Sequence, residues 1–177
     1  MTSSGPLRAI RVRVGQVGYS LAARWAPADD SLLAALSPAE RALFDSMRPA
    51  DRAHGLRVAR RVQVAGYGDP RLLKAALLHD VGKAGHGIHL PHRVARVLLT
   101  ALTPQEFGRI AATDRGWHEP FYALAHHAAI GADLLAAAGS DPLTVALVRS
   151  HDAPNTPAAL FAHADWLRAL KAADDAG

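Results

Sequence analysis

The sequence predicts an all-α fold, and three observations carry the prediction. Apolar residues recur at helical spacing along nearly the whole chain, whereas strand-like alternation is confined to residues 10–14. Ala and Leu are abundant, and aromatic residues make up only 6% of the chain. Half of the 177 residues are hydrophobic and a fifth are charged, which is the balance of a globular protein about one domain in size.

Start and stop signals divide the chain into helices. Ser or Asp followed by Pro marks three starts, and Gly marks three stops. The starts are Ser37-Pro38, where Glu40 completes a capping box, Asp69-Pro70 and Asp141-Pro142, and the stops are Gly66, Gly82 and Gly139. We expect helices at 7–25, 30–36, 38–47, 50–65, 70–81, 91–101, 104–112, 120–138, 142–151 and 157–174.

The expected organisation is a single helical bundle, 48–177, with residues 1–47 as an N-terminal helical extension packed on it. No Gly- and Ser-rich linker and no internal repeat divides the chain. No apolar run approaches the length of a membrane span, and arginines interrupt the first 18 residues, so we expect a cytoplasmic protein.

The net charge and the lack of cysteine limit the kinds of partner and of chemical site that we expect. The net charge of +4 and the pI of about 10.0 favour an anionic partner such as a nucleotide. The basic residues Arg8, Arg11, Arg13 and Arg24 suit nucleic acid or an anionic membrane, but a solvated helix face is the favoured interpretation. There is no cysteine, which excludes thiolate metal sites and cysteine nucleophiles, so any metal must bind to His, Asp or Glu.

Histidines and carboxylates fall at inward-facing positions. His79 and Asp80 end the apolar stripe of the 70–81 helix, where burial costs several kcal/mol unless a partner such as a divalent cation satisfies both. His54 shares its helix face with Val58, Val62 and Ala65. His127 shares the 120–138 helix with the apolar residues Ile130, Leu134 and Leu135, and His151 ends the 142–151 helix after several apolar residues.

Two aspartates of the last predicted helix compete as the sixth ligand. Asp165 and Asp174 are nine residues apart and therefore lie on opposite helix faces. Asp174 lies on the line of Leu160 and Leu167, whereas Asp165 shares its line with polar and small residues. We therefore expect Asp174 to point inward.

The order His54, His79-Asp80, His127, His151, Asp174 closely resembles that of the HD-domain metal-dependent phosphohydrolases, over about residues 50–175. Residues 72–83 resemble the superfamily's Ala-Leu-Leu-His-Asp-Val-Gly-Lys core. Residues 51–59 resemble the segment around its first histidine, and 167–174 the closing Ala-Asp motif. Residues 127–132 resemble its His-Pro-x-x-Gly-Ala segment, with Ala128 where Pro is common.

The resemblance implies a metal-dependent phosphohydrolase acting on a nucleotide or another small phosphate ester or anhydride. By this likeness His54, His79, Asp80 and Asp174 hold one metal. His127 and His151 hold a second metal, with Asp80 bridging. A metal-activated hydroxide would attack phosphorus, and Lys83, placed beyond the Gly82 stop, would stabilise charge on the phosphoryl oxygens. Such ligands suit Fe, Mn, Co, Ni or Zn.

Two alternatives remain at this stage. In the first, His127 and His151 are core histidines beside a single metal. In the second, the chain is a catalytically silent module that binds a nucleotide or a partner protein. Several polar or aromatic side chains near the motif could contact a substrate or metal, or could simply be exposed to solvent. For each of them, solvent exposure is at least as well supported. These are the loop residues His86, His89 and His92, the neighbouring Arg93 and Arg96, His126, and Trp117, which has the shape to stack on a base.

Overall fold

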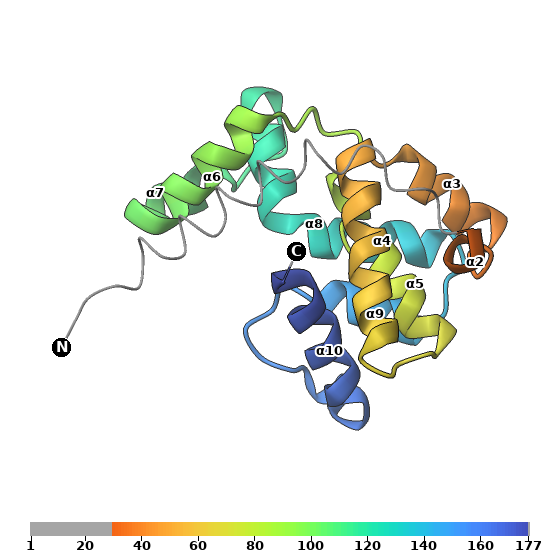
Figure 1. Cartoon of the computed structure of the whole chain (residues 1–177). Helices are drawn as coiled ribbons and strands as arrows, with labels where there is room; N and C mark the ends of the chain where they lie inside the picture. Colours follow the sequence, from red (N-terminus) through yellow and green to blue (C-terminus); the bar gives the residue numbers. More distant parts are fainter. Residues whose placement is uncertain (1–29, 177) are drawn as a thin grey trace.

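The computed structural model describes residues 30–176 and shows the all-α fold that the sequence predicts (Figure 1). Within those residues there are nine α-helices and no strand. The α-helices are α2 (Asp30–Leu33), α3 (Pro38–Ser46), α4 (Pro49–Val64), α5 (Pro70–Leu78), α6 (Leu90–Leu102), α7 (Pro104–Ile110), α8 (Glu119–Ala137), α9 (Pro142–Ser150) and α10 (Ala164–Asp175). Short 3₁₀ helices are η2 (Val81–Lys83), η3 (Gly116–His118) and η4 (Ala158–His163). The helix expected at 7–25 lies outside the described residues.

The predicted helix starts are confirmed by their hydrogen bonds. Ser37 Oγ accepts from the main-chain N–H of Glu40, and Glu40 Oε2 accepts from that of Ser37, which completes the capping box. Asp69 and Asp141 each accept a bond from the main-chain N–H two residues on. The stops at Gly66 and Gly139 are also confirmed, since their φ angles of 93° and 74° suit glycine.

The expected helix stop at Gly82 is wrong. Helix α5 ends at Leu78, and Gly82 lies inside η2 without a positive φ. A Cβ at Gly82 would lie 2.1 Å from the carbonyl oxygen of His127. Glycine is needed here because the backbone of η2 meets that of α8, and this contact brings Asp80 towards His127.

The continuous helix expected at 157–174 is also wrong. It is divided into η4 and α10 at His163, whose φ of −126° is outside the helical range. Leu160 and Leu167 are nevertheless both buried, one on each side of the break. Ala65, expected on the buried face of α4, is exposed because α4 ends at Val64.

The core is shared by most of the helices. Helix α4 packs against α5, α5 and α8 pack against α9, and α10 packs against α4 and α5. Residues before position 48 join this core through Leu32, Leu33, Phe44 and Met47. Buried Glu40 on α3 strengthens this attachment, because it accepts bonds from Lys74 of α5 and from Ser140.

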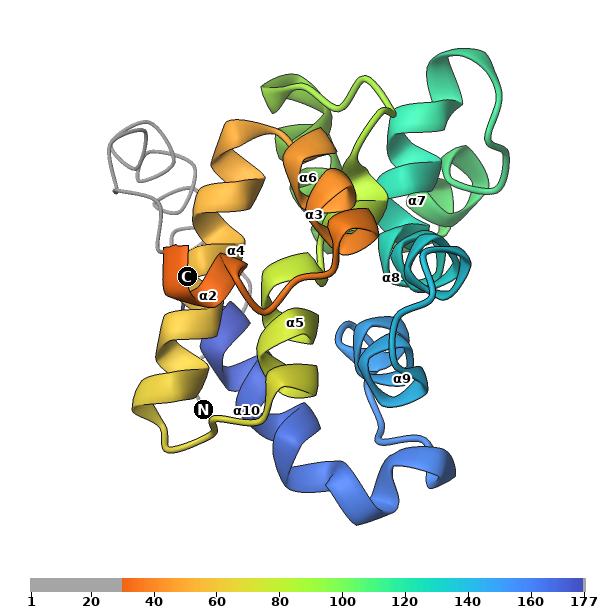
Figure 2. The same ribbon diagram turned by 90° about the vertical axis from the view of Figure 1, so that its right-hand side faces the viewer.

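Helices α6 and α7 lie at one end of the molecule and α10 at the other, as both views show (Figures 1 and 2). Helix α8 runs between these ends. In the described part of the chain, none of the helices combines the length and the apolar character needed to cross a bilayer.

Candidate metal centre

The structure brings all six predicted ligand residues together. His54 comes from α4, and His79 and Asp80 directly follow the end of α5. The others are His127 of α8, His151 directly after α9, and Asp174 near the end of α10. Close backbone packing helps to assemble them. A Cβ at Gly55, next to His54, would lie 2.5 Å from the carbonyl oxygen of Leu77.

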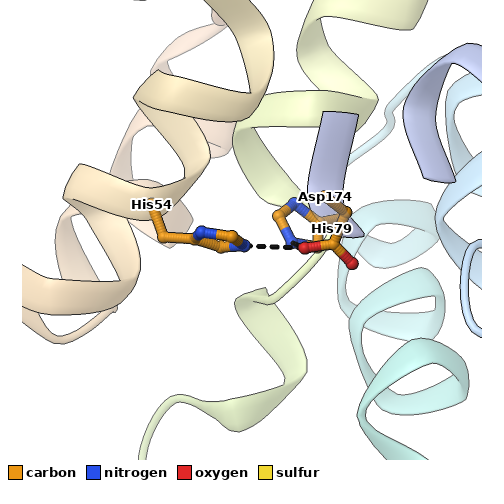
Figure 3. Close-up of side chains that lie close together, drawn as sticks. All are labelled: His54, His79 and Asp174. Carbon is orange, nitrogen blue, oxygen red and sulfur yellow. Dashed lines mark hydrogen bonds and ion pairs between the residues drawn. The ribbon is translucent and has the colours of Figure 1, made fainter. Parts of the chain in front are cut away.

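Asp174 lies between two of the histidines (Figure 3). Its Oδ1 is 2.7 Å from Nε2 of His54 and 3.5 Å from Nε2 of His79. His54 and Asp174 are partly open to solvent, with exposed fractions of 20% and 32%, whereas His79 is fully buried. Solvent therefore reaches this cluster from the His54 and Asp174 side.

Asp80 is the second carboxylate of the cluster. Its Oδ1 lies 2.6 Å from Nζ of Lys83, 3.6 Å from Nε2 of His79 and 3.5 Å from Nε2 of His127. Lys83 is only 13% exposed, and its side chain lies beside Asp80 although it does not follow a helix stop. In this arrangement Lys83 neutralises Asp80.

Three of the histidines are oriented in the same way. Nδ1 of His79, His127 and His151 each donates to the main-chain carbonyl three residues earlier, at 2.9, 3.2 and 2.7 Å. A carbonyl only accepts, so Nδ1 carries the proton and Nε2 of a neutral ring keeps its lone pair. Such bonds orient metal-ligating histidines in proteins.

The Nε2 atoms of these three rings have poor hydrogen-bond partners within the protein. His79 Nε2 is buried without a hydrogen-bond partner. Nε2 of His127 and Nε2 of His151 face each other at 3.2 Å, although both rings already carry a proton on Nδ1. A cation would satisfy all three nitrogens, so the donor set fits a metal.

The charges of the cluster shift its pKa values strongly. Burial opposes ionisation of Asp80, but Lys83, His79 and His127 hold its pKa well below the usual range. Burial likewise opposes ionisation of Asp174, and its contacts with His54 and His79 lower its pKa. Both carboxylates are therefore ionised at neutral pH and available as ligands.

The pKa values of the buried histidines shift in opposite directions. Burial lowers the pKa of His79, but the charges of Asp80 and Asp174 overcome this effect and raise it to about 9. Burial and the charge of Lys83 hold the pKa of His127 well below its usual range. Burial and the charge of His79 lower the pKa of His151. His127 and His151 are thus neutral at pH 7, the form that binds metals.

Two overlapping groups of ligand atoms could each hold a cation. Ligand atoms of His54, His79 and Asp174 lie within 4.8 Å of one another, as do those of His79, Asp80 and His151. His127 adjoins the second group through its contacts with Asp80 and His151. The first group contains three of the four residues expected to hold one metal, and the second combines Asp80 and His151 of the expected second site with His79.

The other residues considered from the sequence lie elsewhere. Asp165 is exposed on α10, and His126 is exposed and contacts the carbonyl of Ala111. His86 bonds to Glu119, and His92 accepts a bond from the main-chain N–H of His89 at the start of α6. Trp117 is exposed, with its ring against that of His118.

Sequence reasoning missed the partner of Arg93. Asp51 lies one helical turn before His54 and is buried, and Arg93 Nη2 donates to both of its oxygens, at 2.8 and 2.9 Å. The one available signal was an acidic residue three positions before a predicted ligand. Its partner on α6 is 42 residues away, which no local pattern reveals.

We compared the chain with models of protein families, with curated proteins and with solved structures, and it matches none of them. The interpretation of the cluster therefore rests on its residues and their geometry.

Proposed function

We propose that the protein is a metal-dependent phosphohydrolase acting on a nucleotide or another small phosphate ester or anhydride. The observation that carries this proposal is the convergence of four histidines and two ionised carboxylates in which Nε2 of His79 is buried and unsatisfied. Divalent cations bound there would activate water and draw charge from the phosphoryl oxygens.

The charge of the cluster favours an anionic substrate. Among the described residues, two carboxylates belong to it, Asp80 and Asp174, so two divalent cations would carry more charge than these ligands neutralise. Lys83 adds a further positive charge at the same place. Phosphate esters and anhydrides supply the negative charge that such a site attracts.

The protein's own residues would have separate roles in the reaction. Three main-chain carbonyls hold the rings of His79, His127 and His151 in place, so that these three ligands need not reorient. Lys83 keeps Asp80 ionised and lies ready to contact the phosphoryl oxygens of a substrate. The partly open side at His54 and Asp174 would admit the substrate.

The test is hydrolysis of bis(p-nitrophenyl) phosphate by protein reconstituted with Mn²⁺. We expect metal-dependent release of p-nitrophenol that is abolished in Asp80→Asn. Asp133→Asn is the matched control, because Asp133 is an exposed aspartate of α8. A protein that binds Mn²⁺ and nucleotides but hydrolyses neither this diester nor any nucleotide in a screen would instead be the catalytically silent binding module.

A further inference from the structure

Arg57 is a partly buried arginine of α4, the helix that carries His54. The two residues are three positions apart, so they are neighbours on the helix surface, with Cβ atoms about 5–6 Å apart. The Cα–Cβ bonds of an α-helix tilt towards its N-terminus, which directs Arg57 towards the turn that contains His54. Arg57 therefore lies beside the metal centre.

The end of α10 lies along the same part of α4. His54 Nε2 is 2.7 Å from Oδ1 of Asp174 (Figure 3), and Arg61 Nη1 donates to the main-chain carbonyl of Ala173 at 3.1 Å. Arg57 comes between His54 and Arg61 in the chain, and the helical repeat places all three on one side of α4. Since His54 and Asp174 form the partly open side of the cluster, Arg57 adjoins the side from which solvent reaches the ligands.

The guanidinium group of Arg57 lacks an anionic partner among the residues that the structure describes. Other arginines of α4 differ, since Arg61 donates to a carbonyl of α10 and Arg52 pairs with Asp45. Burial and the neighbouring charge of Arg61 both lower the pKa of Arg57. Desolvation and a like charge each make an unpaired cation unfavourable, and a bound anion would relieve both.

We propose that Arg57 binds a phosphate group of the substrate at the open side of the metal centre. The proposal rests on the proposed function, because it needs an anionic substrate at that centre. A guanidinium group forms paired, charge-assisted hydrogen bonds with phosphate oxygens. Arg57 gives up no ion pair with the described residues when it binds phosphate, whereas Lys83 must share its charge with Asp80.

The test is calorimetric titration of inorganic phosphate into the Mn²⁺-loaded protein. Arg57→Ala should weaken phosphate binding by about tenfold to a hundredfold, the effect of a lost charge-assisted hydrogen bond. Arg57→Lys should restore part of the affinity, because it keeps the charge and loses the paired geometry. Arg168→Ala is the matched control and should bind phosphate as the parent does, because Arg168 is an exposed arginine of α10 on a different face from Asp174.

Titration of Mn²⁺ into the same variants separates phosphate binding from a structural role. Arg57→Ala should bind Mn²⁺ like the parent, because Arg57 is not a ligand, whereas loss of Mn²⁺ and phosphate binding together would make Arg57 a structural residue and overturn the inference. Should Arg57→Ala fail to fold, Arg57→Lys and Arg57→Gln decide the question, with phosphate binding weaker in the second and Mn²⁺ binding unchanged in both.

Two outcomes distinguish this inference from the proposed function. A folded Arg57→Ala variant that binds both Mn²⁺ and phosphate like the parent overturns the inference and leaves the proposed function intact. A parent protein that binds no Mn²⁺ overturns the proposed function, and the inference with it.

Discussion

Nε2 of His127 and Nε2 of His151 lie 3.2 Å apart, although Nδ1 of each ring donates to a main-chain carbonyl. Two neutral imidazoles in this arrangement direct their lone pairs at each other, and both rings have pKa values below the usual range. A shared proton is therefore disfavoured at pH 7. A cation between the rings and Asp80 would remove the repulsion.

The first prediction concerns the number of metals. His127→Ala should reduce the Mn²⁺ content of the saturated protein from two equivalents to one, because His54, His79, Asp80 and Asp174 remain. Metal analysis by mass spectrometry measures this, with His126→Ala as the control, since His126 is the exposed neighbour. A His127→Ala variant with the parent's metal content would make His127 a core residue.

The second prediction separates the two aspartates of α10. Asp174→Asn should abolish hydrolysis and lower the metal content, because Asp174 contacts both His54 and His79. Asp165→Asn should leave both quantities unchanged, since Asp165 is exposed. Metal analysis and the diester assay on the two variants test this, and the reverse pattern would show that Asp165 is the ligand.

The third prediction concerns Lys83. Lys83→Ala should lower kcat by about 10²–10³, the typical effect of losing a preorganised electrostatic contact. The metal-free variant should also lose about 1–3 kcal/mol of stability, because buried Asp80 loses its ion-pair partner. Kinetics at saturating Mn²⁺ and urea unfolding without metal measure the two effects. A parent-like kcat would exclude a role for Lys83 in the reaction.

The fourth prediction is a stability maximum of the metal-free protein near pH 6.5. The pKa of His79 is raised to about 9, so its stabilising contribution is complete below pH 6.5 and is lost as the pH rises to 9. The pKa values of His127 and His151 are lowered, so their contribution is present above pH 6.5 and is lost as the pH falls.

Thermal unfolding from pH 5 to 9 measures both limbs of this profile. His79→Gln should remove the decline at alkaline pH and leave the acidic decline in place. In the parent protein, Mn²⁺ should bind more tightly as the pH rises, since the metal replaces the proton on Nε2 of His79. Stability that is flat between pH 6.5 and 9 in the metal-free parent would contradict the charge state assigned to His79.

The fifth prediction concerns Gly82. Gly82→Ala should destabilise the protein by about 1–3 kcal/mol or more, because the new Cβ would meet the carbonyl oxygen of His127. The substitution should also weaken binding of the second metal, because η2 and α8 would have to move apart. Gly87→Ala is a useful comparison, because Gly87 has open space for a Cβ but a positive φ of 60°. It should cost stability without changing the metal content.

Much of the fold could be predicted because its signals are local. Ser37, Asp69 and Asp141 cap helices with their own side chains, and Gly66 and Gly139 end helices through their own φ angles. Gly82 shows the limit of such signals. Its neighbour across the contact is His127, 45 positions away, so the sequence around Gly82 looks like a helix stop while the tertiary contact decides its conformation.

The candidate site also has features that the sequence predicts and features that it does not. The residues suited to bind metal could be selected, because ligand types recur at inward-facing helical positions. The pair of Lys83 with Asp80 and the pair of Arg93 with Asp51 could not, because they depend on how side chains pack after the helices meet. The break at His163 was also hidden, since the apolar line through Leu160 and Leu167 continues across it.

The most direct test of the account is calorimetric titration of Mn²⁺ into the metal-free protein at pH 7.5. The six clustered ligands predict binding of two equivalents per chain, with Asp80→Asn losing both or retaining one weak site. A parent protein that binds no Mn²⁺, Fe²⁺ or Zn²⁺ would contradict the account, because Nε2 of His79 and the facing nitrogens of His127 and His151 would then have no cation to satisfy them.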